Sequence, residues 1–160
     1  MKIDITSLKT HHEEVLEVNE TLKLEKEQFE NTEIMELKDT TVKGNIYPYG
    51  DEDYELNLVV EGTMVLPCSI TLKPVDYKFN AEISGIYTEM MMEIEKIDKK
   101  IENLLDIFPI IWENILMEIP IKVTCPEATD LKLSGDGWKL VTEESLEETN
   151  SAFDKLKELL

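Results

Sequence analysis

Residues 58–81 constrain the fold more than any other part of this chain. Residues 58–66 are largely apolar and β-branched, which is typical of a strand with at least one buried face. Gly62 interrupts this run and indicates a β-bulge or a close backbone approach. Pro67 has no N–H to donate, so it predicts the end of the strand, and Cys68 follows directly. Residues 75–81 alternate apolar and polar side chains, so we predict an antiparallel sheet that folds back at Pro67 and Cys68.

The preceding residues extend this sheet. Residues 41–47 form a strand pattern, residues 48–53 supply turn residues, and residues 54–65 read as the long return strand of a hairpin. Residues 41–79 therefore predict a three-stranded meander, and residues 16–24 a further strand. The fold class is α+β, with an antiparallel sheet packed by a few helices in a single domain. Closure of the sheet into a barrel is left open.

The clearest helix runs from residue 106 to residue 119. Asp106 is a suitable N-cap, and Pro109 lies in the first turn, where its missing N–H costs little. Pro120 predicts the end of the helix. One apolar stripe contains Phe108, Ile111, Trp112, Ile115, Leu116 and Ile119. We expect this stripe to pack across the sheet, with Trp112 in the core.

The rest of the chain carries weaker patterns. Residues 90–105 have apolar spacing that favours a helix, but two short strands fit as well. Residues 121–125 predict a short strand ending at Pro126, and residues 138–141 an edge strand. The domain is expected to span residues 1–142. Residues 143–160 are predicted to form an acidic amphipathic helical tail.

The charge of the chain is strongly asymmetric. It has 35 acidic residues against 16 basic ones, a net charge of −19, and every basic residue is a lysine. Phosphate backbones are bound mainly by Lys and Arg, and bidentate contacts need arginine. We therefore expect a basic protein partner rather than bare RNA. The alternative is that the acidic surface only maintains solubility.

The sequence lacks the usual motifs of an enzyme. It has no Gly-rich phosphate loop and no Gly-x-Ser-x-Gly motif, so we expect no catalytic activity and no cofactor. A zinc site would need Cys68, Cys125, His11 and His12 together, and local Cys-x-x-Cys spacing is missing. No apolar run is long enough to span a membrane, and residues 1–10 lack a signal-peptide core. We expect a cytoplasmic protein with reduced thiols.

Two motifs resemble the bacterial YceD family. They are Gly62-Thr63-Met64-x-Leu66-Pro67-Cys68-x-x-Thr71-Leu72 and Asp106-x-x-Pro109-x-Ile111-x-Glu113-Asn114-Ile115-x-x-Glu118-Ile119-Pro120, followed by Cys125. The resemblance implies a non-enzymatic factor linked to accumulation of 23S ribosomal RNA and to large-subunit assembly. Family genes commonly lie beside the gene for ribosomal protein L32, which makes L32 the first candidate partner. The family resemblance also favours the hairpin interpretation of residues 90–105, because relatives look strand-like there.

This sequence departs from the family pattern at two positions. Thr71 stands where many members carry a second cysteine, and Ile70 stands where an arginine is usual. Both departures weaken metal binding and direct RNA contact.

The motif residues are the candidate contacts, and each also has a structural interpretation. They are Gly62, Thr63, Pro67, Cys68, Thr71, Leu72, Pro109, Glu113, Asn114, Pro120 and Cys125. We favour structural roles for Gly62, Pro67 and Pro109, and leave Glu113 and Asn114 open. The alternatives to a protein-binding factor are an RNA-binding protein using Lys43, Lys73, Lys78 and Lys122, and a metal or redox module using Cys68 and Cys125.

Overall fold

A computed structural model describes residues 1–24, 29–94, 103–129, 134–135 and 138–139. The tail expected over residues 143–160 lies outside these residues. The elements in chain order are β1 (Lys2–Asp4), α1 (Thr6–Lys9), β2 (Leu16–Thr21), β3 (Glu36–Tyr49), β4 (Asp53–Pro67), β5 (Pro74–Ile86), α2 (Tyr87–Glu93), β6 (Leu104–Asp106), α3 (Phe108–Met117), α4 (Pro126–Thr129), β7 (Ser134–Gly135) and β8 (Trp138–Lys139). None of the described helices is long and apolar enough to cross a membrane.

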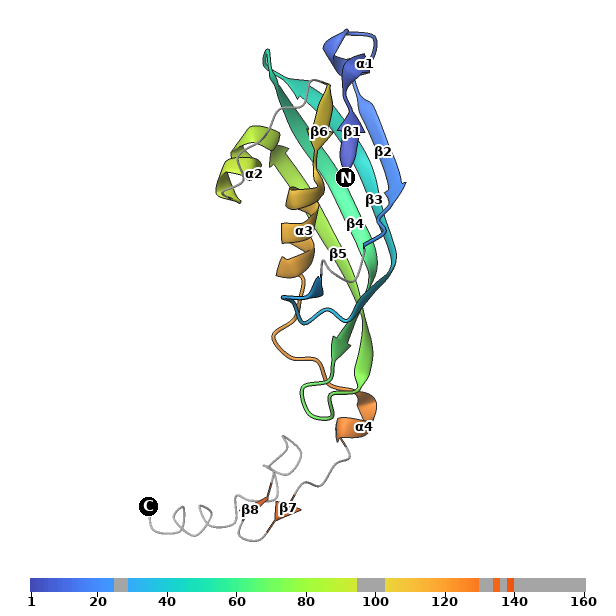
Figure 1. Cartoon of the computed structure of the whole chain (residues 1–160), viewed down its shortest axis with the longest axis vertical. Coiled ribbons are helices and arrows are strands. Elements are labelled where there is room, and N and C mark those ends of the chain that lie inside the picture. The colour runs from blue at the N-terminus through green and yellow to red at the C-terminus, as the bar shows by residue number, and fades with distance from the viewer. Residues whose placement is uncertain (25–28, 95–102, 130–133, 136–137, 140–160) are drawn as a thin grey trace, which may run out of the picture.

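One long antiparallel sheet organises the molecule, in the order β2-β3-β4-β5 (Figure 1). The predicted meander is confirmed, because β3, β4 and β5 are consecutive neighbours. The fold-back at the end of β4 is also confirmed, since Pro67 pairs with Pro74 at the last step of the ladder. The described strands do not close into a barrel. The fold is an α+β domain in which the sheet stays open.

Of the two alternatives expected at Gly62, the close backbone approach is present there, and the bulge lies on the neighbouring strand. The β3–β4 register shifts between Lys38 and Thr41, which places an extra residue on β3 opposite Gly62. Asp39, inside this bulge, has a φ of 48°. A Cβ atom on Gly62 would lie 2.6 Å from the Thr40 Oγ1 atom. Gly62 therefore provides the close approach that the bulge needs, while β4 itself pairs with β5 without interruption.

Helices cover one face of the sheet. α2 and α3 lie across it in Figure 1, and the alternate residues of β4 that face them are buried. Ile110, Ile111 and Ile115 of α3 are fully buried, which confirms the predicted packing. Trp112 is partly buried at the edge of this core, where its ring lies 6.0 Å from that of Phe29. The aromatic side chain is thus part of the packing.

Asp106 is not the N-cap of α3, although the prediction was close. It is the last residue of β6, where its backbone pairs with Lys2 of β1, and Ile107 takes the N-cap position. The Asp106 carboxylate still accepts a hydrogen bond from the Phe108 N–H at 3.2 Å. Pro109 lies in the first turn and Pro120 follows the helix end, as expected.

Residues 90–105 combine both patterns that the sequence left open. α2 ends at Glu93, the segment 95–102 lies outside the described residues, and Leu104 begins strand β6. β6 pairs antiparallel with β1, and the two form a separate two-stranded sheet. This pairing was not predicted, because its two strands are three residues long and far apart in the sequence.

The two short strands predicted after α3 have different outcomes, and residues 140–141 of the second lie outside the described residues. Residues 121–125 form no strand, because Pro120 and Pro126 flank them and their hydrogen bonds go to the loop after β4. Trp138–Lys139 is a strand, but it pairs with Ser134–Gly135 instead of extending the main sheet. The predicted edge strand is therefore one arm of a small hairpin.

Candidate functional site

The corner between β4 and β5 is built by tight backbone hydrogen bonds. The Cys68 N–H donates to the Lys73 carbonyl at 2.8 Å, and the Leu72 N–H donates to the Cys68 carbonyl at 2.9 Å. Leu72 has a φ of 59°, a conformation that costs a non-glycine residue about 1–2 kcal/mol. The closed loop fixes this strained residue in place.

Two cysteines that are far apart in the sequence meet beneath this corner. The Cys125 N–H donates to the Cys68 Sγ atom at 3.3 Å, and the Thr71 Oγ1 atom lies 3.3 Å from the Cys125 Sγ atom. Both thiols are free and buried, and Val75 packs against them. Cys68, Thr71 and Cys125 therefore join the corner to the segment that follows α3.

A second link holds the same two segments together. The Ser69 N–H donates to the Val123 carbonyl at 2.8 Å, and the Val123 N–H donates to the Ser69 Oγ atom at 3.3 Å. The Lys73 ammonium pairs with the Glu127 carboxylate at the start of α4. Residues 121–127 are therefore fixed against the corner by backbone, hydroxyl and charged contacts.

These hydrogen bonds change the acidity of one thiol. Donation from the Thr71 hydroxyl, followed by donation from the Cys125 N–H, lowers the pKa of Cys68 to about 6. A thiolate at neutral pH is a nucleophile, but the Cys68 side chain is fully buried. A thiolate at this position would accept these hydrogen bonds more strongly than the neutral thiol does, and burial keeps the Sγ atom out of contact with solvent.

The corner does not provide the ligands of a zinc site. Structural zinc takes four cysteine or histidine ligands, and here the third polar group is the Thr71 hydroxyl. His11 and His12 follow α1 at the opposite end of the molecule (Figure 1). Within the described ranges, no three His, Cys, Asp or Glu side chains are grouped to hold a metal ion.

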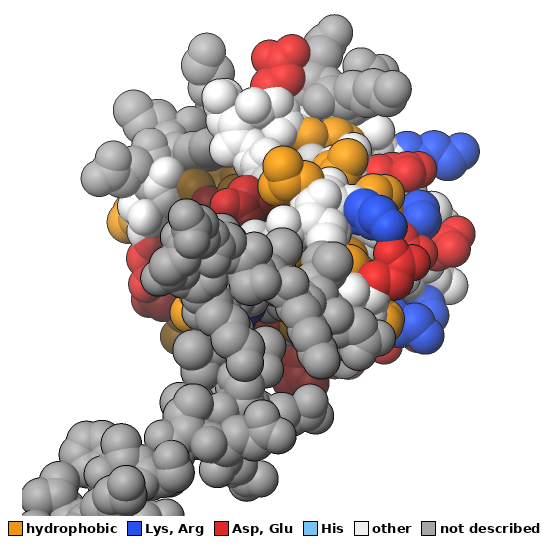
Figure 2. All heavy atoms as spheres, turned by 90° about the horizontal axis from the view of Figure 1, so that it is seen from below, with side chains coloured by type: hydrophobic (Ala, Val, Ile, Leu, Met, Phe, Trp, Pro, Cys, Tyr) orange, Lys and Arg blue, Asp and Glu red, His pale blue; other side chains and the backbone are white. Residues whose placement is uncertain are grey.

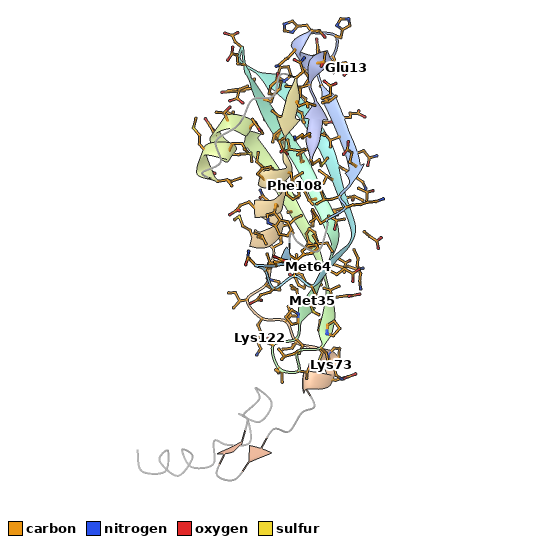
Figure 3. The ribbon with its side chains drawn as sticks, viewed as in Figure 1. Glu13, Met35, Met64, Lys73, Phe108 and Lys122 are labelled. Carbon is orange, nitrogen blue, oxygen red and sulfur yellow. The ribbon has the colours of Figure 1, made fainter. Side chains whose placement is uncertain are left out.

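The outside of the corner exposes apolar side chains. Leu72 is 75% exposed, Ile121 is fully exposed and Ile70 is partly exposed. We call Ile70, Leu72 and Ile121 the corner surface. Figure 2 views this end of the molecule and shows apolar side chains among lysine and acidic ones, and Figure 3 places Lys73 and Lys122 at the same end. Exposed apolar side chains among charged groups are a feature of protein-binding sites.

Comparison with known sequences identifies the family. The profile described as "Large ribosomal RNA subunit accumulation protein YceD" matches residues 56–160. The chain belongs to the YceD family. It is also 30% identical over 138 residues to the uncharacterized protein YlbN of Bacillus subtilis (strain 168), covering 82% of this chain and 76% of that relative. No solved structure matches the chain.

The YceD family residues divide into two groups in the structure. The corner brings together Pro67, Cys68, Thr71, Leu72 and Cys125. The other motif residues lie elsewhere, in mid-strand or along α3: Gly62, Thr63, Pro109, Glu113, Asn114 and Pro120.

Glu113 and Asn114 are the two residues of α3 whose role the sequence left undecided, and their environments differ. The Asn114 Nδ2 atom donates to the Ile110 carbonyl at 2.8 Å, which occupies its amide within the helix. Glu113 is exposed. The structural interpretation therefore fits Asn114, while contact with a partner stays a prediction for Glu113.

Sequence reasoning missed four residues of the YceD corner. They are Ser69, Ile121, Val123 and Glu127. Ile121 could have been noticed, because it stands between Pro120 and Lys122, where no regular element can bury it. The Ser69–Val123 contacts depend on tertiary pairing, and nothing in the local sequence signals them.

Proposed function

We propose that this chain supports accumulation of large-subunit ribosomal RNA by binding a basic ribosomal protein, without catalysing a reaction. The observation that carries this proposal is the net charge of −19 in a chain without arginine. Ribosomal proteins that contact RNA must be rich in positive charge, so an acidic protein attracts them and repels phosphate. Ribosomal protein L32 is the first candidate partner.

The positions of the lysines support a protein partner over RNA. Residues two apart on a strand share a face, and neighbours in register share it too. By this rule, Lys43 and Lys78 lie on the uncovered face of the sheet, and so do Glu61 and Glu82. Glu61 lies between Lys43 and Lys78, and Lys38 on the same face pairs with Asp76, so the described residues give this face no continuous positive track for a phosphate backbone.

The remaining two candidate lysines lie at the corner. Lys73 is neutralised by the Glu127 carboxylate, and Lys122 is exposed. Among the described residues of the corner, Lys122 is then the lysine left without a carboxylate in ion-pair distance, and one lysine adds little electrostatic attraction for RNA. The corner surface is better suited to apolar contact with a folded or extended protein.

Affinity purification of the full-length chain from growing cells tests the proposal. We expect basic ribosomal proteins to be recovered, and to remain bound after nuclease treatment. Loss of all ribosomal proteins on nuclease treatment would mean that RNA bridges the association, and would contradict the proposal. Titration of binding against salt then separates the two candidates, because direct phosphate contacts weaken steeply with salt.

A matched pair of variants tests the corner surface in the same experiment. Leu72→Asp places a charge on the corner, and Met92→Asp places one on α2, at a residue of similar exposure. We expect Leu72→Asp to reduce recovery of ribosomal proteins and Met92→Asp to leave it unchanged. Equal recovery with both variants would exclude the corner surface as the contact.

A further inference from the structure

A cavity of about 450 Å³ lies at the other end of the molecule from the corner. It opens between α1, the β3–β4 turn, the start of α2 and β6. Its floor is apolar and is formed by the buried side chains of Ile5, Leu8, Tyr54 and Leu105. The volume is in the range of pockets that bind ligands or anchoring side chains.

Tyr54 gives this cavity a hydroxyl group that has no hydrogen-bond partner among the described residues. The side chain is only 7% exposed, and its hydroxyl makes no hydrogen bond to the residues that the structure describes. In those residues, every side-chain nitrogen or oxygen that is fully buried has a partner. The Tyr54 hydroxyl is not among the fully buried atoms, so it retains access to open space, and Tyr54 lines this cavity. A tyrosine hydroxyl in such a position can donate a hydrogen bond to a ligand or accept one from it.

The rim of the cavity is acidic. Of the residues that the structure describes, Asp51, Glu52 and Asp53 line the cavity from the β3–β4 turn, and Lys9 and His11 line it from the end of α1. The Asp53 Oδ1 atom accepts the Tyr54 N–H at 2.8 Å and the Thr88 N–H at 3.3 Å. Both bonds end on Oδ1, so the second carboxylate oxygen, Oδ2, keeps its acceptor capacity.

We propose that this cavity binds an arginine side chain of the basic partner protein. The inference rests on the proposed function and names the site at which the partner is recognised. A guanidinium group offers a fork of N–H donors to the Asp51 and Asp53 carboxylates, and it can also donate to the Tyr54 hydroxyl. The apolar stem of arginine would cover Ile5 and Leu8.

Other occupants fit the cavity less well. An anion would face the carboxylates of the rim, and a wholly apolar ligand would offer no hydrogen-bond donor to the Tyr54 hydroxyl or to the Asp53 Oδ2 atom. A second copy of this chain cannot supply the group, because the sequence contains no arginine. The occupant must therefore come from a different, basic polypeptide.

The first experiment uses N-acetyl-arginine methylamide as the probe and the ¹H–¹⁵N spectrum of the full-length chain as the readout. We expect saturable shifts of the Tyr54 and Thr88 amides, and at least about fivefold weaker binding of N-acetyl-norleucine methylamide. Tyr54→Phe retains the ring and removes the hydroxyl, so it should weaken arginine binding about three- to tenfold. Shifts that are scattered over the acidic surface, or are equal for both probes, would overturn the proposal.

A matched pair of charge variants controls for the net charge. Asp51→Asn/Glu52→Gln removes two charges from the cavity rim, and Glu61→Gln/Glu82→Gln removes two from the uncovered sheet face. We expect the first variant to weaken binding of the probe about tenfold and the second to change it less than twofold. Equal effects of the two variants would mean that binding of the probe depends only on the net charge of the chain. That result would overturn the proposal that the cavity is the binding site.

Recovery of ribosomal proteins with the same variants separates this inference from the proposed function. If the wild-type chain retains basic proteins and the rim variant loses them, both are supported. If wild type and rim variant retain them equally, the cavity proposal is overturned and the proposed function stands. If the wild-type chain retains none, the proposed function fails, and the cavity proposal fails with it as a site for a partner protein.

Discussion

The backbone N–H of Cys125 donates to the Sγ atom of Cys68 at 3.3 Å, across 57 positions of sequence. The two cysteines of the family motif thus form one structural unit with Thr71, instead of two independent features. This unit joins the β4–β5 corner to the chain after α3, and it orders the loop from which Leu72 projects.

The acidity of Cys68 predicts a pH dependence of stability. The folded state lowers the pKa of this thiol to about 6, whereas an unfolded thiol titrates near about 8.5. Between these values the unfolded state binds more protons, so the free energy of unfolding should rise with pH from about 6 to about 8.5. The gain should be lost as pH falls through about 6. Urea unfolding under reducing conditions, compared with Cys68→Ala, measures it.

Two further variants identify the cause of this pH dependence. Thr71→Val removes the hydroxyl that contributes most to the lowered pKa, so the rise with pH should become smaller. Cys125→Ala keeps the backbone N–H donor and should retain most of the rise. An identical slope in wild type and Cys68→Ala would show that the Cys68 thiol does not titrate as described.

Gly62→Ala should destabilise the sheet by about 1–3 kcal/mol, because its Cβ atom would meet the Thr40 Oγ1 atom at 2.6 Å and the Phe79 ring at 3.1 Å. Removing the hydroxyl in the double variant Gly62→Ala/Thr40→Ala should recover part of this cost. Gly85→Ala is the control, since its Cβ atom would meet only the flexible Met90 side chain. Additive losses in the double variant would contradict the proposed contact. Urea unfolding provides all the free energies.

Ile115→Ala should lower the free energy of unfolding by about 2–5 kcal/mol, because the side chain is fully buried between α3 and the sheet. Met117→Ala, two residues later on the same helix, removes a side chain that is 75% exposed. It should change stability by less than about 0.5 kcal/mol. Similar losses for both variants would mean that α3 is not docked on the sheet as described.

Leu72→Gly should separate binding from stability. Glycine adopts a φ of 59° without strain, so the relief of about 1–2 kcal/mol should match or exceed the extra chain entropy lost on folding. The thermal midpoint should therefore stay equal or rise, while recovery of ribosomal proteins falls. A lower midpoint would indicate that the Leu72 side chain stabilises the corner, and unchanged recovery would remove it from the contact surface.

The sequence predicted the parts of the fold that depend on local periodicity. The alternation along β4 and the stop at Pro67 sufficed for the meander, and the spacing of Ile111 and Ile115 sufficed for α3. Gly62 indicated a bulge or a close backbone approach, and the structure has the close approach at Gly62 and the bulge opposite it, at Asp39. A glycine in a strand pattern indicates that another group approaches its backbone closely, but it does not indicate which of the two paired strands carries the bulge.

The candidate site was predictable in part for a different reason. Pro67 and Cys68 mark the corner in the sequence, but the approach of Cys125 depends on the path of the chain after α3. The cavity was not predictable at all, because Ile5, Tyr54 and Leu105 come from three separate segments that only the tertiary fold combines.

The pairing of β1 with β6 sets an order of events during synthesis. Ile3 lies in register with Leu105, and the Ile5 N–H donates to the Asn103 carbonyl at 3.0 Å. The hairpins of β3, β4 and β5 can form as soon as each strand leaves the ribosome, because their partners are consecutive. β1 must wait for about a hundred further residues, so the nascent chain displays Ile3 and Ile5 unpaired until β6 emerges. The floor of the cavity beneath α1 is therefore among the last features to be completed.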